Sequence, residues 1–265
     1  MLLILFFSTI IISLVLTNIL EKKFSQYSLF IDKPKDRSTH LNPIPTAGGI
    51  SIIITFTLYI LALHNIFNVN NTILFFLFAS LLPIVIVSII DDYKEINIRL
   101  RLLVQFFSAS LIVYYFQISN VSNYAIYLNQ ESFLIIIISI LLSMWLMNLY
   151  NFMDGIDGYA ASECIFVSFS SALIIYFNNE NSILSLYLLG LGLSSIGILI
   201  KNWHPAKIFM GDTGSVSIGM LFAFFIFYSA SESVISIYTW LILLSVFISD
   251  SSYTCLLYTS PSPRD

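Results

Sequence analysis

The chain has 265 residues, of which 58% are hydrophobic and only 10% are charged. Soluble domains carry about 25% charged residues, because their surface has to be compatible with water. A mean hydropathy of +0.90 therefore excludes an ordinary water-soluble globule and favours a protein whose surface faces lipid. The net charge of −4 offers no face for binding a polyanion, so we expect no nucleic acid partner.

Nine apolar stretches follow one another along the chain. Most approach the about 20 residues that an α-helix needs to cross a hydrocarbon core about 30 Å thick. Only α-helices and closed β-barrels satisfy their backbone hydrogen bonds within lipid. The alternation of apolar and polar residues that is typical of barrel strands is absent, so helices are expected. We therefore predict an all-α, polytopic membrane helix bundle with about nine transmembrane helices. The predicted spans are 1–20, 47–64, 73–90, 102–118, 133–150, 161–177, 183–200, 215–231 and 234–250.

The basic residues predict how these spans are oriented. When the loops are assigned alternately to two sides, every Lys and Arg outside the C-terminal tail falls on one side. The positive-inside rule makes that side cytoplasmic and places the N-terminus outside. Most carboxylates and the Gly-rich loops share the basic side, so we expect the active site on the cytoplasmic face.

Two of the cytoplasmic loops hold candidate residues with competing interpretations. Arg37 and His40 lie in a proline-rich loop that, on its own, is better explained as a basic segment attracted to anionic lipid. Asp91 and Asp92 directly follow a span, and their repulsion and desolvation call for a cation such as a hard divalent metal. Alternatively, one aspartate caps the following helix and the other is solvated.

The segment 148–158 is the strongest candidate. Its polar residues recur every three positions: Asn148, Asn151, Asp154 and Asp157. On a regular α-helix they would spread over half the circumference, whereas a tightened, 3₁₀-like end would align them better. Oxygen-only side chains suit Mg²⁺ or Mn²⁺ and sugar hydroxyls. A set of polar contacts between helices is the less favoured alternative.

A fourth loop leads into the span that begins at Ser215. Gly211 and Gly214 flank the pair Asp212-Thr213, so backbone N–H groups at this helix start could bind a phosphate while Asp212 holds the metal. The same string is also a common turn. Together, carboxylates, Gly-rich backbone and basic side chains on one membrane face suit metal-assisted phosphoryl transfer between a soluble nucleotide and a membrane-held acceptor.

These segments resemble the polyprenyl-phosphate N-acetylhexosamine-1-phosphate transferases (glycosyltransferase family 4). The resemblance runs from about residue 30 to 250, through DKPKDRSTHLNPIPTAGGI, DDYKEINIRLRLLVQ, NLYNFMDGIDG and HPAKIFMGDTGS, in the family's order. It implies transfer of a sugar phosphate from a UDP-N-acetylhexosamine to undecaprenyl phosphate, with Mg²⁺ or Mn²⁺ and release of UMP, at a bacterial inner membrane. The resemblance does not decide the oligomeric state, and a homodimer is one possibility.

The resemblance also implies roles for single residues. Asp212 would be the direct Mg²⁺ ligand, with Asp91 and Asp92 near the metal and the lipid phosphate. The uridine nucleotide would be surrounded by Asn151, Asp154, Asp157 and Asn202, with Asn148 behind them. We predict a catalytic set of Asp91, Asp92, Asp154 and Asp157, a metal-binding set of Asp212 and Asp92, and a substrate-binding set of Asn148, Asn151, Asn202, Arg37, His40, Gly211, Gly214 and Ser215.

The predicted reaction is a direct attack by the lipid phosphate on the β-phosphorus. The lipid phosphate is mostly a dianion at neutral pH and hardly needs a strong base, so Asp91 would orient it more than deprotonate it. A two-step route through an aspartyl intermediate stays open.

The NFMDGIDG motif and the Arg/His-bearing loop resemble the branch that initiates O-antigen or other surface polysaccharides, with UDP-GlcNAc, UDP-FucNAc or UDP-QuiNAc as candidate donors. The phospho-N-acetylmuramoyl-pentapeptide branch is the alternative, although its Lys-rich loop and its Leu-Thr in place of Phe152-Met153 are missing here. An ion-coupled secondary transporter is a further alternative, but transporters usually hold their carboxylates near the midplane.

The C-terminal end departs from the family pattern. Residues 1–250 are expected to form a single integral membrane transferase domain, whereas 251–265 form an atypical tail. Family members usually continue into a loop with a His-x-His motif and then a further helix. We therefore expect this end to be truncated or foreign, which bears on whether the chain is active as written.

Overall fold

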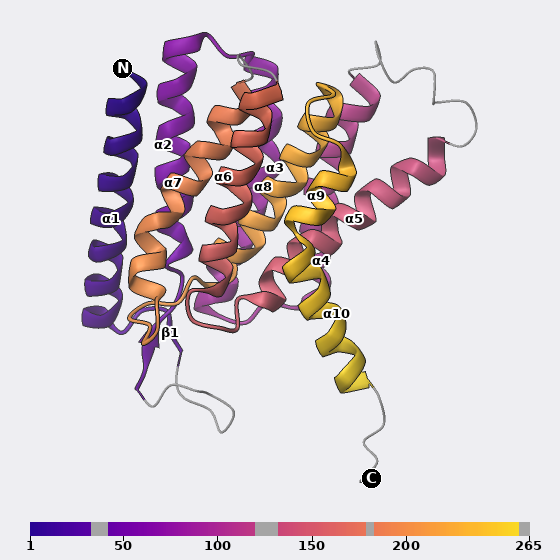
Figure 1. The fold of residues 1–265 in the computed structure, drawn as a ribbon. Helices are drawn as coiled ribbons and strands as arrows, with labels where there is room; N and C mark the ends of the chain where they lie inside the picture. The colour runs from indigo at the N-terminus through magenta and orange to yellow at the C-terminus, as the bar shows by residue number, and fades with distance from the viewer. Residues whose placement is uncertain (33–41, 120–131, 179–182, 260–265) are drawn as a thin grey trace.

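The computed structural model describes residues 1–32, 42–119, 132–178 and 183–259, and Figure 1 shows them as a bundle of helices. The predicted all-α membrane bundle is confirmed. The elements are α1 (Leu2–Tyr27), β1 (Ile31–Asp32), β2 (Ile44–Pro45), α2 (Gly49–Phe67), α3 (Asn71–Tyr93), α4 (Ile98–Val113), the π-helix η1 (Tyr114–Ser119), α5 (Ser132–Met153), α6 (Tyr159–Asn178), α7 (Ile183–Asn202), α8 (Gly211–Ser231), α9 (Ile237–Leu243) and α10 (Ser245–Thr259).

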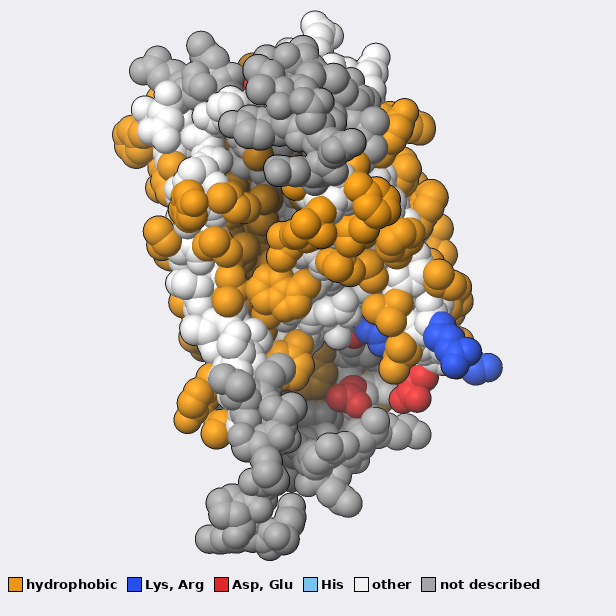
Figure 2. All heavy atoms as spheres, turned by 90° about the vertical axis from the view of Figure 1, so that its right-hand side faces the viewer, with side chains coloured by type: hydrophobic (Ala, Val, Ile, Leu, Met, Phe, Trp, Pro, Cys, Tyr) orange, Lys and Arg blue, Asp and Glu red, His pale blue; other side chains and the backbone are white. Residues whose placement is uncertain are grey.

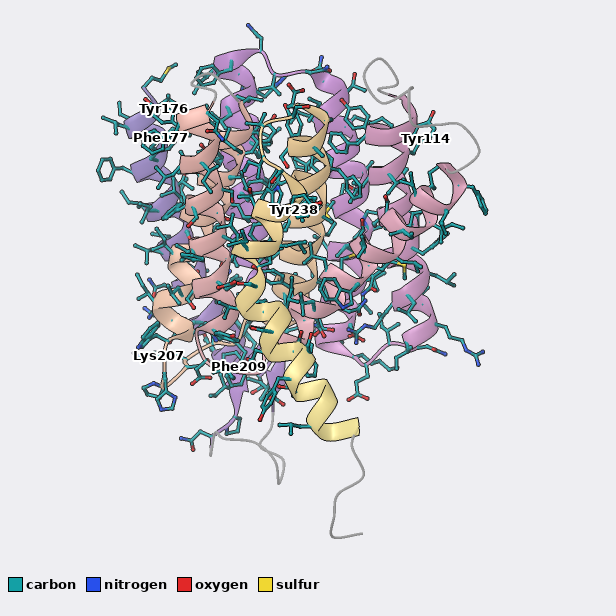
Figure 3. All side chains as sticks on the ribbon, turned by 45° about the vertical axis from the view of Figure 1, so that its right-hand side comes forward. Tyr114, Tyr176, Phe177, Lys207, Phe209 and Tyr238 are labelled. Atoms are coloured by element: carbon teal, nitrogen blue, oxygen red, sulfur yellow. The ribbon has the colours of Figure 1, made fainter. Side chains whose placement is uncertain are left out.

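In the described ranges, eight helices are long and apolar enough to cross a membrane, and they correspond to the first eight predicted spans. Figure 2 shows hydrophobic side chains over most of one face, with Lys, Arg, Asp and Glu gathered toward its lower end. In Figure 3, Tyr114, Tyr176 and Phe177 lie toward one end of the bundle, and Lys207 and Phe209 lie at the other. Aromatic side chains at a bundle end are typical of a membrane–water interface.

The ninth predicted span, 234–250, is not one continuous helix. The structure breaks it at Leu244 into α9 and α10, and α10 diverges from the bundle in Figure 1. Neither proline nor glycine lies in this stretch, so the sequence gives no local signal for the break. Phe247 of α10 is fully buried and packs against the rings of Tyr150 and Tyr159.

The helix α8 occupies the centre of the bundle. It packs against α2, α3, α4, α5 and α7, and its aromatic residues Phe222, Phe224 and Phe225 are fully buried. A helix that is buried on all sides needs apolar residues around its whole circumference, which explains the weak amphipathic pattern of this segment. Its first turn therefore lies in the middle of one bundle end.

This end, which we call the charged end, carries β1, β2, the turn 154–158 and the loop 203–210 (Figure 1). The strands pair antiparallel, with Ile31 opposite Pro45. The backbone N–H groups of Gly48 and Gly49 then donate to the carbonyl oxygens of Phe209 and Met210 at 2.9 and 2.8 Å. The chain entering α2 is thus fixed to the chain entering α8.

Helix ends differ from the prediction in ways that matter for the site. The helix α3 continues to Tyr93 and α8 begins at Gly211, so Asp91, Asp92 and Asp212 lie in helical turns. The α-helix α5 continues to Met153, and the next turn closes with a 3₁₀-type hydrogen bond from the Asp154 N–H to the Asn151 carbonyl oxygen at 3.3 Å. The first turn of α8, which precedes the apolar segment that begins at Ser215, is held by hydrogen bonds to Asp92.

Close packing of two glycines holds the charged end together. A Cβ atom on Gly49 would lie 2.1 Å from the Cα atom of Gly214, which no rearrangement of a side chain could relieve. We expect Gly49→Ala to lower the free energy of unfolding by about 3 kcal/mol, the upper end of overpacking costs. Thermal unfolding in detergent would measure this.

Gly155→Ala is the matched control. A Cβ atom there would have its nearest neighbour, the carbonyl oxygen of Phe152, 4.0 Å away. Its melting temperature should equal that of the unmodified chain. Equal melting temperatures for both variants would contradict the tight contact between α2 and α8.

Candidate active site

A carboxylate from another helix holds the start of α8. Asp92, in the last turn of α3, accepts hydrogen bonds from the backbone N–H groups of Asp212 and Thr213 at 2.9 and 3.0 Å. The Thr213 hydroxyl donates to the same carboxylate at 2.6 Å. The first N–H groups of a helix lack partners within it and favour a negative charge. Asp92 therefore caps α8, whereas Asn97 caps the following helix, α4.

The second aspartate of the pair, Asp91, binds an arginine. The Arg101 guanidinium contacts Asp91 Oδ2 through Nη1 at 2.7 Å and Asp212 Oδ2 through Nη2 at 2.6 Å. The other oxygen of Asp91 accepts a hydrogen bond from the Ile96 N–H at 2.7 Å. One guanidinium thus links the end of α3 to the start of α8.

The amide of Asn151 completes the surroundings of Asp212. Its Nδ2 donates to Asp212 Oδ1 at 2.7 Å and to Ser215 Oγ at 3.2 Å. Ser215 in turn donates to the carbonyl oxygen of Gly211 at 3.1 Å. The structure therefore brings Asn151 of α5 against Asp212 and Ser215 of α8, which follow it by 61 and 64 positions in the sequence.

Asp154 lies in the turn after α5 and is half-buried. Burial raises its pKa well above the ordinary value of a carboxyl group, and the nearby carboxylates of Asp212 and Asp92 raise it further. A hydrogen bond from the backbone of Gly211 lowers the pKa, but the raising effects are larger. Asp154 therefore holds a proton more readily than an exposed aspartate does. A nearby cation would stabilise its ionised form.

The remaining acidic residue of the motif, Asp157, lies in a second cluster. Its Oδ2 contacts His204 Nδ1 at 2.9 Å and accepts from the Ala206 N–H at 3.1 Å. Asn202 accepts from the Gly158 N–H at 2.9 Å and donates to the Ile208 carbonyl oxygen at 3.0 Å. Asp157 and Asn202 thus join the turn 154–158 to the loop 203–210.

Asn148 faces a different partner from the other members of its motif. It exchanges hydrogen bonds with Gln105 of α4, at 2.7 and 3.4 Å, and donates to the Met144 carbonyl oxygen. It also lines a groove of about 340 Å³ between α5 and α10, whose other lining residues are Trp145, Leu149, Phe152, Ser251 and Ser252.

Glycines of the GDTGS string serve close packing. Gly211 has a φ of 73°, and a Cβ atom there would lie 2.6 Å from Thr46 Oγ1 and 2.8 Å from Asp92 Oδ1. Gly214 contacts Gly49. Because Asp92 already occupies two N–H groups of this helix start, the binding of a phosphate there stays a prediction. Arg37 and His40 lie outside the described residues.

Sequence reasoning missed Arg101, Gln105, Thr213 and His204 as members of these clusters. Arg101 and Gln105 are four positions apart in the first half of a largely apolar helix, so they share one face. Two large polar side chains on one face of a membrane helix favour an internal polar contact, and this signal could have identified them. Thr213 and His204 carry no comparable local signal.

Comparison with known proteins adds independent information. The family model described as glycosyl transferase family 4 matches residues 73–230, a range that includes all the carboxylates discussed above. The chain is also 32% identical over 259 residues to the phospho-N-acetylmuramoyl-pentapeptide-transferase of Prochlorococcus marinus subsp. pastoris. That match covers 91% of this chain and 70% of the relative.

Two further relatives have names from another branch. A probable undecaprenyl-phosphate N-acetylglucosaminyl 1-phosphate transferase of Bacillus subtilis is 27% identical over 85% of this chain and 63% of its own length. An undecaprenyl-phosphate alpha-N-acetylglucosaminyl 1-phosphate transferase of Thermotoga maritima is 29% identical over 79% of this chain and 60% of its own length. The chain thus spans three fifths to seven tenths of these three relatives.

The raised pKa of Asp154 predicts a pH-dependent gain in stability for Asp154→Asn. A carboxyl group whose pKa is higher in the folded than in the unfolded state lowers stability as the pH rises through the interval between the two values. An amide stays neutral and can still accept from Gly211, so the variant avoids this loss. Its melting temperature should exceed that of the unmodified chain at about pH 7.5, and the difference should vanish near about pH 4, where an unfolded aspartate binds its proton.

Glu95→Gln, at an exposed position, controls for the loss of one negative charge. An Asp154→Asn variant that melts no higher than this control at neutral pH would refute the explanation by burial and neighbouring carboxylates.

Proposed function

This chain belongs to glycosyl transferase family 4, in which polyprenyl-phosphate hexosamine-1-phosphate transferases are found, and we propose that it transfers an N-acetylhexosamine-1-phosphate from a UDP-sugar to undecaprenyl phosphate. In this reaction an oxygen of the lipid phosphate forms a bond to the β-phosphorus. The bond from the β-phosphorus to the bridging oxygen breaks, and UMP leaves with the electron pair. The products are the lipid-linked sugar diphosphate and UMP.

The observation that supports this proposal most is the assembly of carboxylates at one bundle end. Asp91 and Asp92 from α3, Asp154 from the turn after α5, and Asp212 from α8 surround a single helix start. A chain in water could spread such charges over its surface, but here they gather beside lipid-facing helices. Such a cluster attracts a divalent cation, and the cation would in turn bind the phosphate group of a membrane-held chain.

The chemistry of the donor set fits Mg²⁺, with Mn²⁺ as a substitute. Within the described residues no group of three or more His, Cys, Asp or Glu side chains could hold a metal ion. Mg²⁺, however, is usually bound by one or two carboxylates together with substrate phosphates. Asp92, the second metal ligand predicted from the sequence, has both oxygens engaged at the start of α8, so we propose Asp154 in its place beside Asp212. The ion, when bound, would neutralise the charge that develops on the departing UMP.

Asp91 is proposed to orient the acceptor. One of its oxygens accepts from the Ile96 N–H and the other contacts Arg101, so both are engaged. A lipid phosphate monoester has a second pKa of about 6 and is already mostly a dianion at neutral pH. These contacts favour the direct route over an aspartyl intermediate, because hydrogen bonds to both oxygens of Asp91 stabilise the carboxylate and make it a weaker nucleophile.

The donor nucleotide is proposed to bind where the turn 154–158 meets the loop 203–210. Asp157 and Asn202 fix these two segments against each other through Ala206, Gly158 and Ile208. Asn151, next to Asp212, would contact the diphosphate. The isoprenoid chain is proposed to occupy the groove between α5 and α10, which is apolar and has Asn148 at its polar side.

We assign the chain to the branch that initiates surface polysaccharides, with its site facing the cytoplasm of a bacterial plasma membrane. Phe152-Met153 and the Arg/His-bearing first loop support this branch. The relative from Prochlorococcus carries the peptidoglycan name, so phospho-N-acetylmuramoyl-pentapeptide is the alternative group transferred. A comparison of UDP-linked donors in a transfer assay decides between the two branches.

The proposed activity is tested by UMP release and radiolabel transfer to lipid, with UDP-GlcNAc, UDP-FucNAc, UDP-QuiNAc and UDP-N-acetylmuramoyl-pentapeptide as donors. Release should require undecaprenyl phosphate, stop on chelation and resume with Mg²⁺. Asp212→Asn should lose about a thousandfold in turnover, the upper range for removal of one group that stabilises transition-state charge. Transfer from the pentapeptide donor alone would move the chain to the peptidoglycan branch.

Two results would overturn the proposal. Substantial turnover by Asp212→Asn would remove Asp212 from the metal site. Uptake driven by an ion gradient, without UMP release, would favour the transporter.

The groove makes a separate prediction about the acceptor. Ser252→Trp places an indole in the groove, so the KM for undecaprenyl phosphate should rise about tenfold, a loss typical of one obstructed apolar contact. The KM for the UDP-sugar should not change. Ser249→Trp is the control, since Ser249 is exposed on the same helix and does not line the groove. Equal acceptor KM values for the two variants would place the isoprenoid elsewhere.

A further inference from the structure

The Arg101 guanidinium is shared between two carboxylates by its two arms. Its contacts with Asp91 and Asp212 are 2.7 and 2.6 Å long, within the range of charge-assisted hydrogen bonds. The side chains of Arg101 and Asp212 are each 26% exposed and that of Asp91 is 9% exposed. Partial burial makes such contacts stronger than those of a surface pair.

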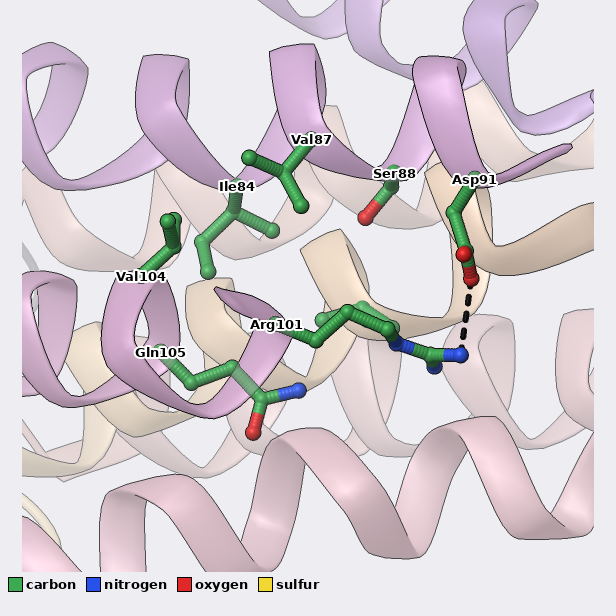
Figure 4. A pocket seen from close by; sticks show the side chains of 8 residues that line it. Ile84, Val87, Ser88, Asp91, Arg101, Val104 and Gln105 are labelled. Carbon is green, nitrogen blue, oxygen red and sulfur yellow. Dashed lines mark ion pairs between the residues drawn. The ribbon is translucent and has the colours of Figure 1, made fainter. Parts of the chain in front are cut away.

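Packing holds the arginine on the α3 side of the site. Figure 4 shows Arg101 extending past a small cavity between α3 and α4, with its guanidinium directed at Asp91. The aliphatic part of the side chain lines this cavity together with Ile84, Val104 and Val216. Asp91 is itself fixed by the Ile96 N–H. The contact with Asp91 is therefore the anchored one, and that with Asp212 is the more accessible.

Two positive charges compete for the Asp212 carboxylate: the Arg101 guanidinium and any divalent cation that enters the site. In the described part of the chain, the Arg101 guanidinium contacts Asp91 and Asp212, and the carboxylates of Asp92 and Asp154 lie close to Asp212. The excess negative charge attracts a divalent cation. Yet the oxygen Asp212 Oδ2 is already occupied by Arg101, and Asp212 Oδ1 accepts from Asn151. A cation that reaches Asp212 must compete with a positive charge held within hydrogen-bonding distance.

We propose that Arg101 is the resident counter-cation of Asp212, and that a divalent metal reaches Asp212 together with the nucleotide diphosphate, displacing one arm of the guanidinium. This inference rests on the proposed function. A free metal ion that displaced this arm would leave it without a partner beside a second positive charge, which is costly in a half-buried site. A diphosphate supplies the arm with a new acceptor, so metal and nucleotide bind cooperatively.

The proposal has a directional consequence that a purely structural arginine would not have. Removal of the guanidinium should weaken the competition for Asp212, so the metal should bind more tightly without nucleotide. Coupling between metal and nucleotide should fall at the same time, because linkage is reciprocal.

The test measures Mn²⁺ binding by electron paramagnetic resonance on the full chain in detergent, without acceptor lipid and with UDP as the nucleotide probe. For the unmodified chain, UDP should tighten Mn²⁺ binding by about tenfold, within the usual range of coupling between two ligands, after correction for Mn²⁺–UDP in solution. Arg101→Gln should bind Mn²⁺ without UDP about tenfold more tightly than the unmodified chain, and UDP should add little.

Arg99→Gln is the matched control, because Arg99 is exposed on the same helix and the variant loses the same charge. It should behave as the unmodified chain does. Arg101→Lys keeps the charge but cannot span both carboxylates, so its affinity should lie between the other two. This variant also tests the proposal if Arg101→Gln does not fold.

An Arg101→Gln or Arg101→Lys variant with the same nucleotide-free Mn²⁺ affinity as the unmodified chain would overturn the inference. So would tight Mn²⁺ binding by the unmodified chain that UDP does not improve. Absence of sugar transfer with intact Mn²⁺ and UDP coupling would instead overturn the proposed function and leave the role of Arg101 standing.

Discussion

The capping of α8 by Asp92 is the contact on which the arrangement of the charged end depends. The first N–H groups of a helix have no partner within it, and the first turn of α8 is largely covered by its neighbours, so a carboxylate from α3 satisfies two of these groups. Once α8 is fixed in this way, Asp212 lies one residue into the helix, within reach of Arg101 and Asn151. The chemistry proposed for the site thus begins as the solution to a problem of backbone hydrogen bonding.

Membrane burial also explains why the acidic residues occur as linked groups. Lone carboxylates near lipid are costly, whereas Asp91, Asp92 and Asp212 each have donors for their oxygens, and Asp154 accepts from Gly211. These internal contacts hold the carboxylates in place before any ligand arrives. Preorganised charge is what phosphoryl transfer requires, because its catalysis rests largely on positioning and electrostatics.

Much of this fold could be predicted from the sequence, because apolar length alone marks a membrane helix. The spans, the family and the candidate residues follow from hydropathy and from four motifs. The break at Leu244 could not be predicted, since packing of Phe247 against Tyr150 and Tyr159 places α10 without a local signal. The partner of Asp92 was equally hidden, because it lies 120 positions away and only tertiary structure brings it near.

The break between α9 and α10 separates the helix that forms one wall of the groove from the part of the bundle that holds the carboxylates. The carboxylates lie on α3, α8 and the turn after α5, whose mutual positions are fixed by hydrogen bonds and by the glycine contact with α2. One wall of the groove, in contrast, belongs to α10, which is attached through Phe247 and a 3.3 Å hydrogen bond from Tyr159 to Asp250. The sequence of this wall can therefore change while the carboxylates keep their geometry.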